Sequence, residues 1–222
     1  MKISIALTVY NGEKFLQNQI DSFLSQTLLP HEIIISDDCS SDKSMDILES
    51  YKSNNDVDIK VFRNDYNLGF TKNFQNAISK CNGDIIFLSD QDDVWYKNKI
   101  ETVVRKYKEN PNIFLIIHDA DLVNENLEKT NLTALSQTKL GFSNTDVFIQ
   151  GALTSFNKVL IKYLVPFPQN LLGHDGYIHF IARNLGTRMV IKDKLQMIRR
   201  HSNNTSDWVA NSLKKINKFD VV

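Results

Sequence analysis

Residues 83–95 read GDIIFLSDQDDVW, and this stretch decides how the chain folds. It begins with an apolar run, Ile85–Leu88, and ends in three carboxylates within four residues. An apolar run bounded by a glycine and by charge is typical of a buried central strand in a mostly parallel sheet. The acids then lie at the carboxyl end of that strand, where open α/β sheets bind their ligands.

Asp90 and Asp92 form a candidate metal site. In an extended backbone, side chains two residues apart point the same way, so these two carboxylates would converge. Convergent carboxylates repel each other unless a cation lies between them, and an all-oxygen pair suits Mg2+ or Mn2+. Such sites leave part of the metal shell to substrate phosphates, which indicates a phosphorylated substrate. The alternative is a solvated acidic turn, because Asp-x-Asp spacing is common.

Composition argues against several classes of function. The 222 residues, 42% of them hydrophobic, suffice for one sizeable core. Lys plus Arg and Asp plus Glu both number 26, so no net basic charge favours nucleic acid as a partner. The longest apolar run, residues 113–117, is far shorter than a membrane span, and the N-terminus lacks a signal-peptide pattern. Because Cys39 and Cys81 lack metal or redox spacing, we expect a cytoplasmic protein with reduced thiols.

Strands and helices are predicted to alternate through the first half of the chain. Apolar alternation and β-branched runs predict strands at residues 3–9, 32–36, 58–63, 85–88 and 113–118. Apolar side chains at helical spacing predict a helix in each interval. This order is typical of a doubly wound α/β domain with right-handed crossovers.

Polar clusters follow three of these strands, at residues 8–11, 37–38 and 90–93. The carboxyl ends of parallel strands share one edge of a sheet, so we expect the clusters to converge in space. A single motif could not have predicted this convergence.

The second half of the chain is less regular. Residues 124–146 are rich in Asn, Thr, Ser and Lys and are predicted as a long loop or flap, which in a compact domain is usually functional or mobile. Further elements are expected as a strand at 150–156, a short helix at 159–164, a helix after residues 173–176, and a pair of strands at 187–191 and 195–199.

Four motifs, in this order, resemble those of family 2 glycosyltransferases. They are TVYN at 8–11, DDCSSD at 37–42, NLG at 67–69 and SDQDDVW at 89–95. Within that family, three later motifs resemble bacterial rhamnosyltransferase-like enzymes that build surface polysaccharides: PFP at 166–168, HDG at 174–176 and RRH at 199–201. The resemblance implies a GT-A fold, a Rossmann-like α/β fold with a mostly parallel central sheet flanked by helices.

The resemblance also implies an activity. A sugar would move from a UDP- or dTDP-sugar to a hydroxyl of a lipid-linked saccharide acceptor, with inversion at the anomeric carbon and with Mn2+ or Mg2+. One GT-A domain is expected over residues 1–205, with 1–120 binding the nucleotide sugar and 121–205 the acceptor. Residues 206–222 are expected to form a helical tail that packs on the domain or touches the inner membrane leaflet.

For the sugar donor, the resemblance assigns Asp38 the hydrogen bond from the pyrimidine N3–H. An acceptor-only carboxylate can take this donor from uracil or thymine alike. The alternative is that Asp37 and Asp38 cap the following helix. Further nucleotide contacts are implied at Thr8, Val9, Tyr10, Asn11, Asn67, Gly69, Asp90 and Gln91. For the residues at the end of the first strand, the alternative is ordinary turn chemistry.

For the metal and the diphosphate, Asp92 matches the direct metal ligand of the family. Asp90 matches an acid that contacts both the ribose and the metal. His201 resembles a late histidine that some members use as a further metal ligand or diphosphate contact. Arg199 and Arg200 could pair with phosphate oxygens, and the alternative for this segment is a basic surface loop.

For catalysis, Asp175 matches the base of the family. An inverting displacement needs one carboxylate beside the attacking hydroxyl, and the alternative for Asp175 is an N-cap of the following helix. His174 is expected to orient Asp175 or to bind the acceptor. Gln150 and Gly151 lie where such enzymes close around the donor sugar. Trp95 is expected either to contact the sugar or acceptor or to belong to the core.

Two other functions compete with this hypothesis. A non-catalytic nucleotide-sugar-binding or scaffold subunit would keep the fold but lack a metal acid or the base, whereas Asp90, Asp92 and Asp175 are all present. A sugar nucleotidyltransferase would need a glycine-rich phosphate loop after the first strand, which residues 8–14 lack. An inverting glycosyltransferase is therefore the favoured hypothesis.

Overall fold

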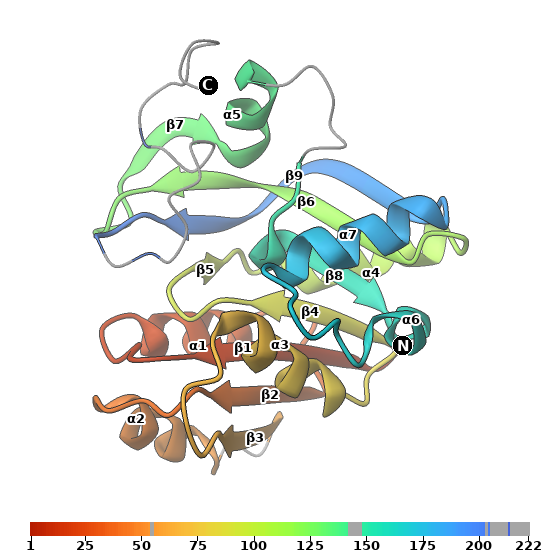
Figure 1. Cartoon of the computed structure of the whole chain (residues 1–222). Coiled ribbons are helices and arrows are strands. Elements are labelled where there is room, and N and C mark those ends of the chain that lie inside the picture. Colours follow the sequence, from red (N-terminus) through yellow and green to blue (C-terminus); the bar gives the residue numbers. More distant parts are fainter. Residues whose placement is uncertain (54–55, 142–147, 203, 205–212, 214–222) are drawn as a thin grey trace.

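A single sheet of nine strands runs through the part of the chain that this computed structural model describes, residues 1–53, 56–141, 148–202, 204 and 213 (Figure 1). Its first half consists of parallel strands: β1 (Ile3–Val9), β2 (Glu32–Asp37), β3 (Asp58–Arg63) and β4 (Ile85–Ser89). They lie in the order β3-β2-β1-β4. All residues of β4 are buried, which confirms the predicted central strand.

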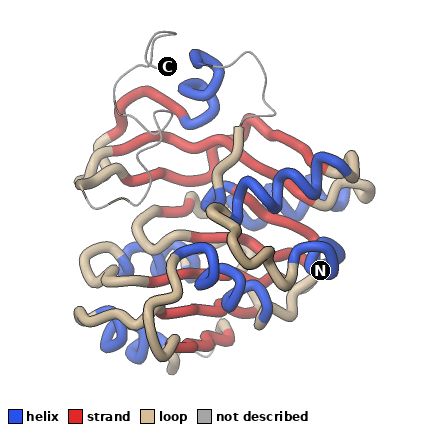
Figure 2. The backbone as a smooth tube through the Cα atoms, viewed as in Figure 1, coloured by secondary structure: helices blue, strands red, loops and turns tan. Residues whose placement is uncertain are grey.

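The second half of the sheet mixes parallel and antiparallel pairs. It contains β5 (Val94–Trp95), β6 (Leu115–Val123), β7 (Lys129–Thr133), β8 (Thr154–Asn157) and β9 (Arg188–Arg199). β8 lies antiparallel between β4 and β6, and β9 runs parallel to β6. Figure 2 shows the two halves as one continuous curled sheet. The predicted parallel pairing therefore holds for the first half, and the sheet as a whole is mixed.

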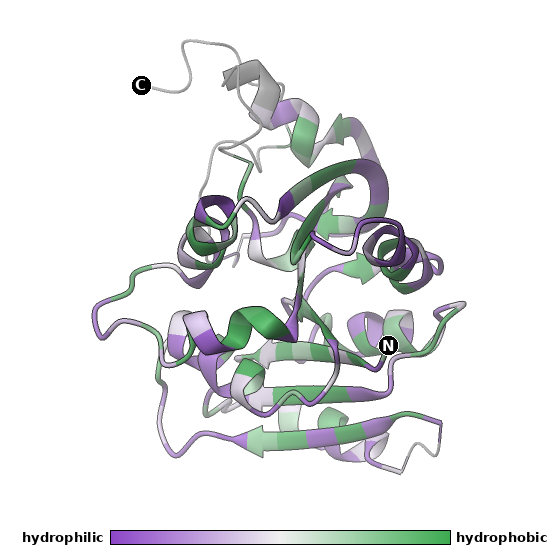
Figure 3. Cartoon of the chain, turned by 90° about the vertical axis from the view of Figure 1, so that its right-hand side faces the viewer, coloured by the Kyte–Doolittle hydropathy of each residue, from purple (hydrophilic) through white to green (hydrophobic). Residues whose placement is uncertain are grey.

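Helices cover both faces of the sheet. One face carries α1 (Leu16–Leu24), α2 (Ser44–Tyr51) and α4 (Lys99–Glu109); the other carries α3 (Phe70–Ser79), α6 (Ile161–Leu164) and α7 (His174–Asn184). Alternate strand residues feed the two cores: Ile33 and Ile35 face the first group of helices, and Ile34 faces the second. Figure 3 shows hydrophobic residues along the strands and mixed hydropathy on the helices.

The loop or flap predicted for residues 124–146 is wrong over most of its length. The chain forms β7 and then α5 (Ala134–Gly141), and residues 142–147 lie outside the described part. A third, smaller core explains why this polar segment folds. Leu135 of α5 packs there with Ile117 and Leu122 of β6 and with Phe148. A few apolar residues of this polar segment thus suffice, because β6 and other parts of the chain supply the rest of the core.

The pair of strands predicted at 187–191 and 195–199 is one continuous strand, β9. The polar residues 192–194 suggested a turn, but they are exposed residues within the strand. Lys194 donates to Asp121 of β6 at 2.7 Å, and Lys129 and Tyr96 donate to the same carboxylate at 2.9 and 2.5 Å. Burial alone would raise the pKa of Asp121, but these three hydrogen bonds lower it to about 2. The Asp121 cluster therefore holds β9 against β6 and β7.

Two further predictions differ from the structure only in detail. The strand expected at 150–156 begins at Thr154, after a 3-10 turn, η2 (Gly151–Leu153). The short helix expected at 159–164 is α6, preceded by the turn η3 (Lys158–Leu160). The predicted tail at 206–222 lies, except for Leu213, outside the described residues. In the described part of the chain, no helix is both long and apolar enough to cross a membrane.

Candidate active site

The polar clusters that follow β1, β2 and β4 meet at one edge of the sheet, as predicted. The side-chain oxygen of Asn11 accepts a hydrogen bond from the main-chain N–H of Ser41 at 2.8 Å, and the main-chain N–H of Asn11 donates to the Ser40 hydroxyl at 2.9 Å. Gln91, beyond β4, is bonded to Tyr10, beyond β1. The three loops therefore form one polar surface.

Gln91 joins two of these loops through both ends of its amide. Its Oε1 accepts the N–H of Tyr10 at 2.8 Å, and its Nε2 donates to the Tyr10 carbonyl at 3.0 Å. Gly12 makes room for it, because a Cβ there would lie 2.4 Å from Gln91 Oε1. The amide thus joins the two loops, and a nucleotide contact of the half-buried Gln91 stays a prediction.

Two other residues of the predicted nucleotide set, Val9 and Thr8, are largely buried. Val9 is 1% exposed in the core, and its main-chain carbonyl accepts the N–H of Asp38 at 2.8 Å. Thr8 is 9% exposed, whereas Tyr10 is 49% exposed. Tyr10 and Asn11 are therefore the members of this strand end that project into solvent.

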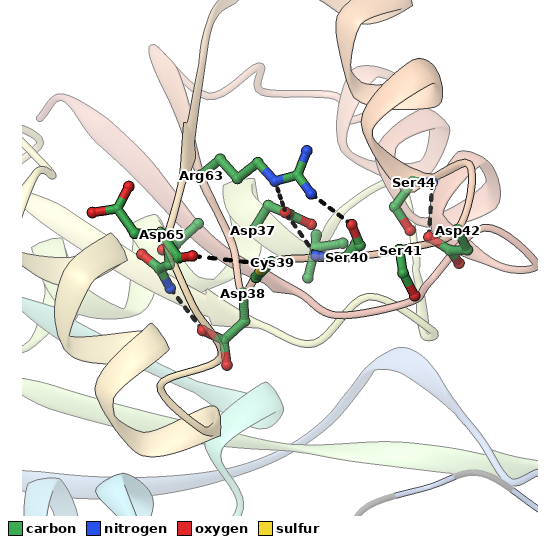
Figure 4. A network of polar contacts seen from close by, with 12 residues as sticks. Asp37, Asp38, Cys39, Ser40, Ser41, Asp42, Ser44, Arg63 and Asp65 are labelled. Atoms are coloured by element: carbon green, nitrogen blue, oxygen red, sulfur yellow. Dashed lines mark hydrogen bonds and ion pairs between the residues drawn. The ribbon is translucent and has the colours of Figure 1, made fainter.

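Asp38 anchors the loop that contains the NLG motif (Figure 4). Its Oδ1 accepts hydrogen bonds from Asn64 Nδ2 and Leu68 N, each at 2.8 Å, and its Oδ2 accepts one from Gly69 N at 2.9 Å. Asn67 also accepts the Gly69 N–H, at 3.1 Å. The carboxylate is 2% exposed, and its predicted contact with a pyrimidine stays a prediction.

The helix-capping alternative for Asp37 and Asp38 is wrong. α2 begins after Lys43, with no side-chain cap hydrogen bond. Asp37 instead accepts the N–H of Ser40 at 3.0 Å and pairs with Arg63 at 3.6 Å, as Figure 4 shows. Both acids therefore shape the loops at the edge of the sheet.

The acidic loop begins where β4 ends, at Ser89. Asp90, the next residue, is exposed. The surrounding protein, followed by the negative charges of Asp92 and Asp175, raises the pKa of Asp90 above its usual value. Three carboxylates therefore lie close enough to influence each other, including one from the distant HDG motif.

Asp92 meets the C-terminal segment that follows β9. Its Oδ2 lies 2.9 Å from His201 Nε2 and accepts a hydrogen bond from Asn204 Nδ2 at 3.1 Å. Asn204 also accepts the His201 N–H at 2.7 Å, so it holds the histidine from two sides. The proximity of Asp92 and His201 matches the predicted metal set. Sequence reasoning missed Asn204, whose only signal was its place in a polar loop.

The donor set of Asp90, Asp92 and His201 fits Mn2+ or Mg2+. Carboxylate oxygens suit both ions, an imidazole suits Mn2+, and a cation would relieve the repulsion that raises the pKa of Asp90. Within the described ranges, no group of three or more His, Cys, Asp or Glu side chains is arranged to hold a metal by itself. A metal that arrives with substrate phosphates needs only one or two carboxylates from the protein.

Arg199 is buried, and its predicted contact with a diphosphate stays a prediction. It is 4% exposed, and its guanidinium donates to the main-chain carbonyls of Asp92 at 2.8 Å and Glu125 at 2.5 Å. The guanidinium lies 4.4 Å from the ring centroid of Phe15, and the Phe15 ring also lies 4.7 Å from the His201 ring. Phe15 thus supports this segment. Sequence reasoning missed it because it directly precedes a predicted amphipathic helix.

Arg200 is half-buried, and its main-chain N–H donates to the Val123 carbonyl at 2.9 Å. This bond holds the segment after β9 against the end of β6. A phosphate contact from the Arg200 side chain stays a prediction.

Asp175 lies in the first turn of α7, but the N-cap of that helix is Gly173. The capping alternative for Asp175 is therefore wrong, although its Oδ1 accepts the N–H of Gly176 at 2.8 Å. Its charge contributes to the raised pKa of Asp90, so the fold brings the predicted base near the predicted metal acids.

His174 is packed tightly beside this base. Its ring stacks on Phe74 with centroids 3.9 Å apart, and a Cβ on Gly151 would lie 2.7 Å from its Nε2. Burial lowers the pKa of His174 to about 4, against the opposing effect of Asp175, so the ring is neutral at neutral pH. Gly151 is thus required for the close approach of η2 to α7, and neighbouring Gln150 lies at the start of that turn.

Trp95 belongs to the core, which corrects its predicted contact with sugar or acceptor and supports the alternative. It is 2% exposed and lies edge-on to Phe23, with ring centroids 4.6 Å apart. Phe87 of β4 lies on another side, at 5.6 Å. Trp95 therefore packs the acidic loop onto α1 and β4.

Comparison with known proteins assigns the family. The model of the family described as glycosyl transferase family 2 matches residues 4–162, more than half of the chain. The chain belongs to this family. Its GT-A fold is shared with solved structures: that of S. aureus TarS 1-349 in complex with UDP superposes with a TM-score of 0.74 at 21% identity, covering 90% of this chain and 61% of that one.

Two further relatives of this family 2 member are informative. The dTDP-rhamnosyl transferase RfbG of Shigella flexneri is 28% identical over 220 residues, covering 89% of this chain and 72% of the relative. The mannosyltransferase PcManGT from Pyrobaculum calidifontis, solved with GDP-Man and Mn2+, has a TM-score of 0.67 at 17% identity, over 90% of this chain and 56% of that one. The chain spans about three fifths of each of these two solved structures.

Proposed function

We propose that this family 2 glycosyltransferase moves a sugar, with inversion, from a UDP- or dTDP-sugar to a hydroxyl of a lipid-linked saccharide in the synthesis of a bacterial surface polysaccharide. The observation that carries the proposal is the polar edge of the sheet, where the loops after β1, β2 and β4 meet and Asp92 lies 2.9 Å from His201. The charge of Asp175, from a distant part of the sequence, contributes to the raised pKa of Asp90, as expected of a site with a metal side and a base side.

The nucleotide would lie across the carboxyl ends of β1, β2 and β4. Tyr10 and Asn11 project into solvent at that edge, and the loop at 67–69 is held beside them by Asp38. A carboxylate has about four lone-pair positions, and Asp38 uses three of them within the protein. One position remains for the N3–H of uracil or thymine.

Asp90 and Asp92 would hold the metal, together with His201. When bound, a divalent cation neutralises the negative charge that develops on the diphosphate leaving group. Asn204 and Phe15 keep the imidazole of His201 in place beside Asp92, so the chain's own contribution is one carboxylate and one imidazole that are held together.

Asp175 would act as the base. As the acceptor oxygen forms its bond to the anomeric carbon, the carboxylate takes the hydroxyl proton, and the bond to the diphosphate oxygen breaks with its electron pair leaving on that oxygen. The neutral His174, fixed between Phe74 and Gly151, forms one wall beside the base. A positioned base of this kind contributes roughly 10²–10⁴-fold to rate.

The names of the relatives support the donor and acceptor classes. One relative is named a dTDP-rhamnosyl transferase, which favours a deoxythymidine nucleotide. Another, from Escherichia coli, is named UDP-Glc:alpha-D-GlcNAc-diphosphoundecaprenol beta-1,3-glucosyltransferase WfgD and is 31% identical over 125 residues, 56% of this chain and 47% of that relative. Its name favours a lipid diphosphate acceptor.

The test is a transfer assay with purified protein and Mn2+. Donors are dTDP-rhamnose, UDP-glucose and UDP-GlcNAc, and the acceptor is a synthetic GlcNAc-diphosphate lipid; release of nucleoside diphosphate and the anomeric configuration of the product are measured. Asp175→Asn should lower turnover by about 10²-fold or more while donor binding persists. The matched control is Asp193→Asn, an exposed acid in β9 that should leave turnover unchanged. A retained anomeric configuration, or full turnover by Asp175→Asn, would refute the proposal.

A further inference from the structure

Lys99, the first residue of α4, is buried beneath the acidic loop. It is 1% exposed, and its Nζ lies 2.5 Å from Gln196 Oε1 and 3.6 Å from the ring centroid of Trp95. A buried ammonium group is costly unless the protein replaces its hydration shell. Lys99 therefore depends on these contacts to replace the water that it loses on burial.

Gln196 of β9 connects Lys99 to the acidic loop. It is fully buried, accepts from Lys99 through Oε1, and donates through Nε2 to Asp93 Oδ2 at 2.8 Å. The other carboxylate oxygen of Asp93 accepts the main-chain N–H of Arg199 at 3.1 Å. Asp93 directly follows Asp92, so these bonds fix the loop that carries the candidate metal ligands.

Lys99 also reaches the opposite side of the site. Its Nζ donates to the carbonyl of Ala152 at 3.4 Å. Ala152 lies in η2 beside Gly151, which packs against His174 next to the base. The buried amino group of Lys99 therefore contacts the turn that supports the base and is linked, through Gln196, to the loop of the metal acids.

We propose that Lys99 and Gln196 form a positioning hub that sets the distance between the acidic loop at residues 90–93 and the η2 turn beside Asp175. The role of those acids rests on the proposed function, whereas the physical linkage does not. Neither hub residue has surface to offer a substrate, since they are 1% and 0% exposed. Burial lowers the pKa of Lys99, against the attraction of Asp93, in keeping with an enclosed network.

The hub is tested with variants that remove the bridge and keep the volume. Lys99→Met removes the ammonium group, and the double variant Lys99→Met/Gln196→Met replaces both partners with apolar chains, which avoids leaving one buried polar group unpaired. Gln196→Asn is the mildest change, since it shortens the bridge by one carbon. Lys108→Met, an exposed lysine on the same helix, is the matched control.

Amide hydrogen exchange is the first readout, with folding checked by circular dichroism. In the hub variants, exchange should accelerate by about tenfold or more in residues 90–95 and 151–153 together, and should stay unchanged in β2. The Lys108→Met control should match the wild type. Unchanged exchange in either segment of the folded variants would overturn the proposal.

Calorimetric titration with UDP and dTDP, with and without Mn2+, separates positioning from simple stability. The hub variants should lose about tenfold in the Mn2+-dependent part of nucleotide affinity and keep the metal-free part. An unchanged Mn2+-dependent affinity alongside faster exchange would overturn the positioning role. If the wild type itself shows no nucleotide binding, the proposed function fails, while the exchange result still decides whether the hub links the two segments.

Discussion

Replacing Asp38 with asparagine separates its structural role from its predicted role in base recognition. In the wild type, Oδ1 receives two hydrogen bonds and Oδ2 receives one, all from the segment 64–69. An asparagine amide has one oxygen, which can occupy the position of either Oδ1 or Oδ2 but not both. Its NH2 group then faces at least one N–H donor, with which it cannot form a hydrogen bond. We expect the oxygen to face the two donors and the bond from Gly69 to be lost.

The expected cost follows from that one bond. A hydrogen bond to a charged group contributes about 1.5–3 kcal/mol, and the buried N–H is left unpaired, so Asp38→Asn should lower the free energy of unfolding by about 2 kcal/mol. For a chain of this size, that loss corresponds to a fall in melting temperature of about 4–8 °C.

Urea denaturation followed by tryptophan fluorescence measures this loss. The matched control is Asp65→Asn, an exposed acid in the same loop, which should change the free energy of unfolding by less than about 0.5 kcal/mol. A loss for Asp38→Asn no larger than that of the control would refute the anchoring role. UDP titration of the same variant then reports on base recognition separately.

Two further predictions concern the second half of the chain. Asp121→Asn should lower the free energy of unfolding by about 1–2 kcal/mol at pH 7. Folding lowers the pKa of Asp121 by almost two units, so its carboxylate stabilises the fold at pH values above the pKa of the unfolded state. The expected loss is smaller than the full shift implies, because the two lysine partners are half-exposed. This difference should vanish between about pH 4 and pH 2, and a pH-independent cost in urea denaturation would argue against it. Gly151→Ala should lower the free energy of unfolding by about 1–3 kcal/mol and should also lower turnover, because the new Cβ would displace the His174 ring. Gly176→Ala, where a Cβ meets nothing within 4 Å, is its control, and equal effects of the two changes would contradict the packing argument.

The first half of the fold was predictable because local signals agree with the tertiary structure there. β3 spans Asp58–Arg63, the predicted range, and β4 and β1 match theirs to within a residue or two. Each of these strands is apolar on the residues that face a core, and turn residues separate them from amphipathic helices. The convergence of the polar clusters followed from the parallel order alone.

The second half was less predictable because its strands depend on partners distant in sequence. Residues 192–194 look like a turn, yet β9 continues through them, since Lys194 pairs with an aspartate 73 residues away. β7 and α5 likewise form on a small core that β6 provides. No local pattern contains this information.

The site was predictable where residue type and role coincide. Asp92 and His201 meet as expected, and Asp175 lies near Asp90. The sequence does not indicate which charged side chains are buried: Arg199 donates to main-chain carbonyls, and Lys99 of α4 is 1% exposed. A charged side chain is expected to be exposed to solvent, so a buried charged residue is recognised only once the structure is known.

The measurement that tests the account most directly is calorimetric binding of UDP and dTDP with and without Mn2+, to the wild type and to Asp92→Asn. The account predicts that Mn2+ tightens binding of at least one nucleotide by about tenfold or more, and that Asp92→Asn retains the metal-free affinity and loses the Mn2+ enhancement. Absence of binding by either nucleotide, or an equal Mn2+ enhancement in Asp92→Asn, would contradict a metal-assisted donor site at this edge of the sheet.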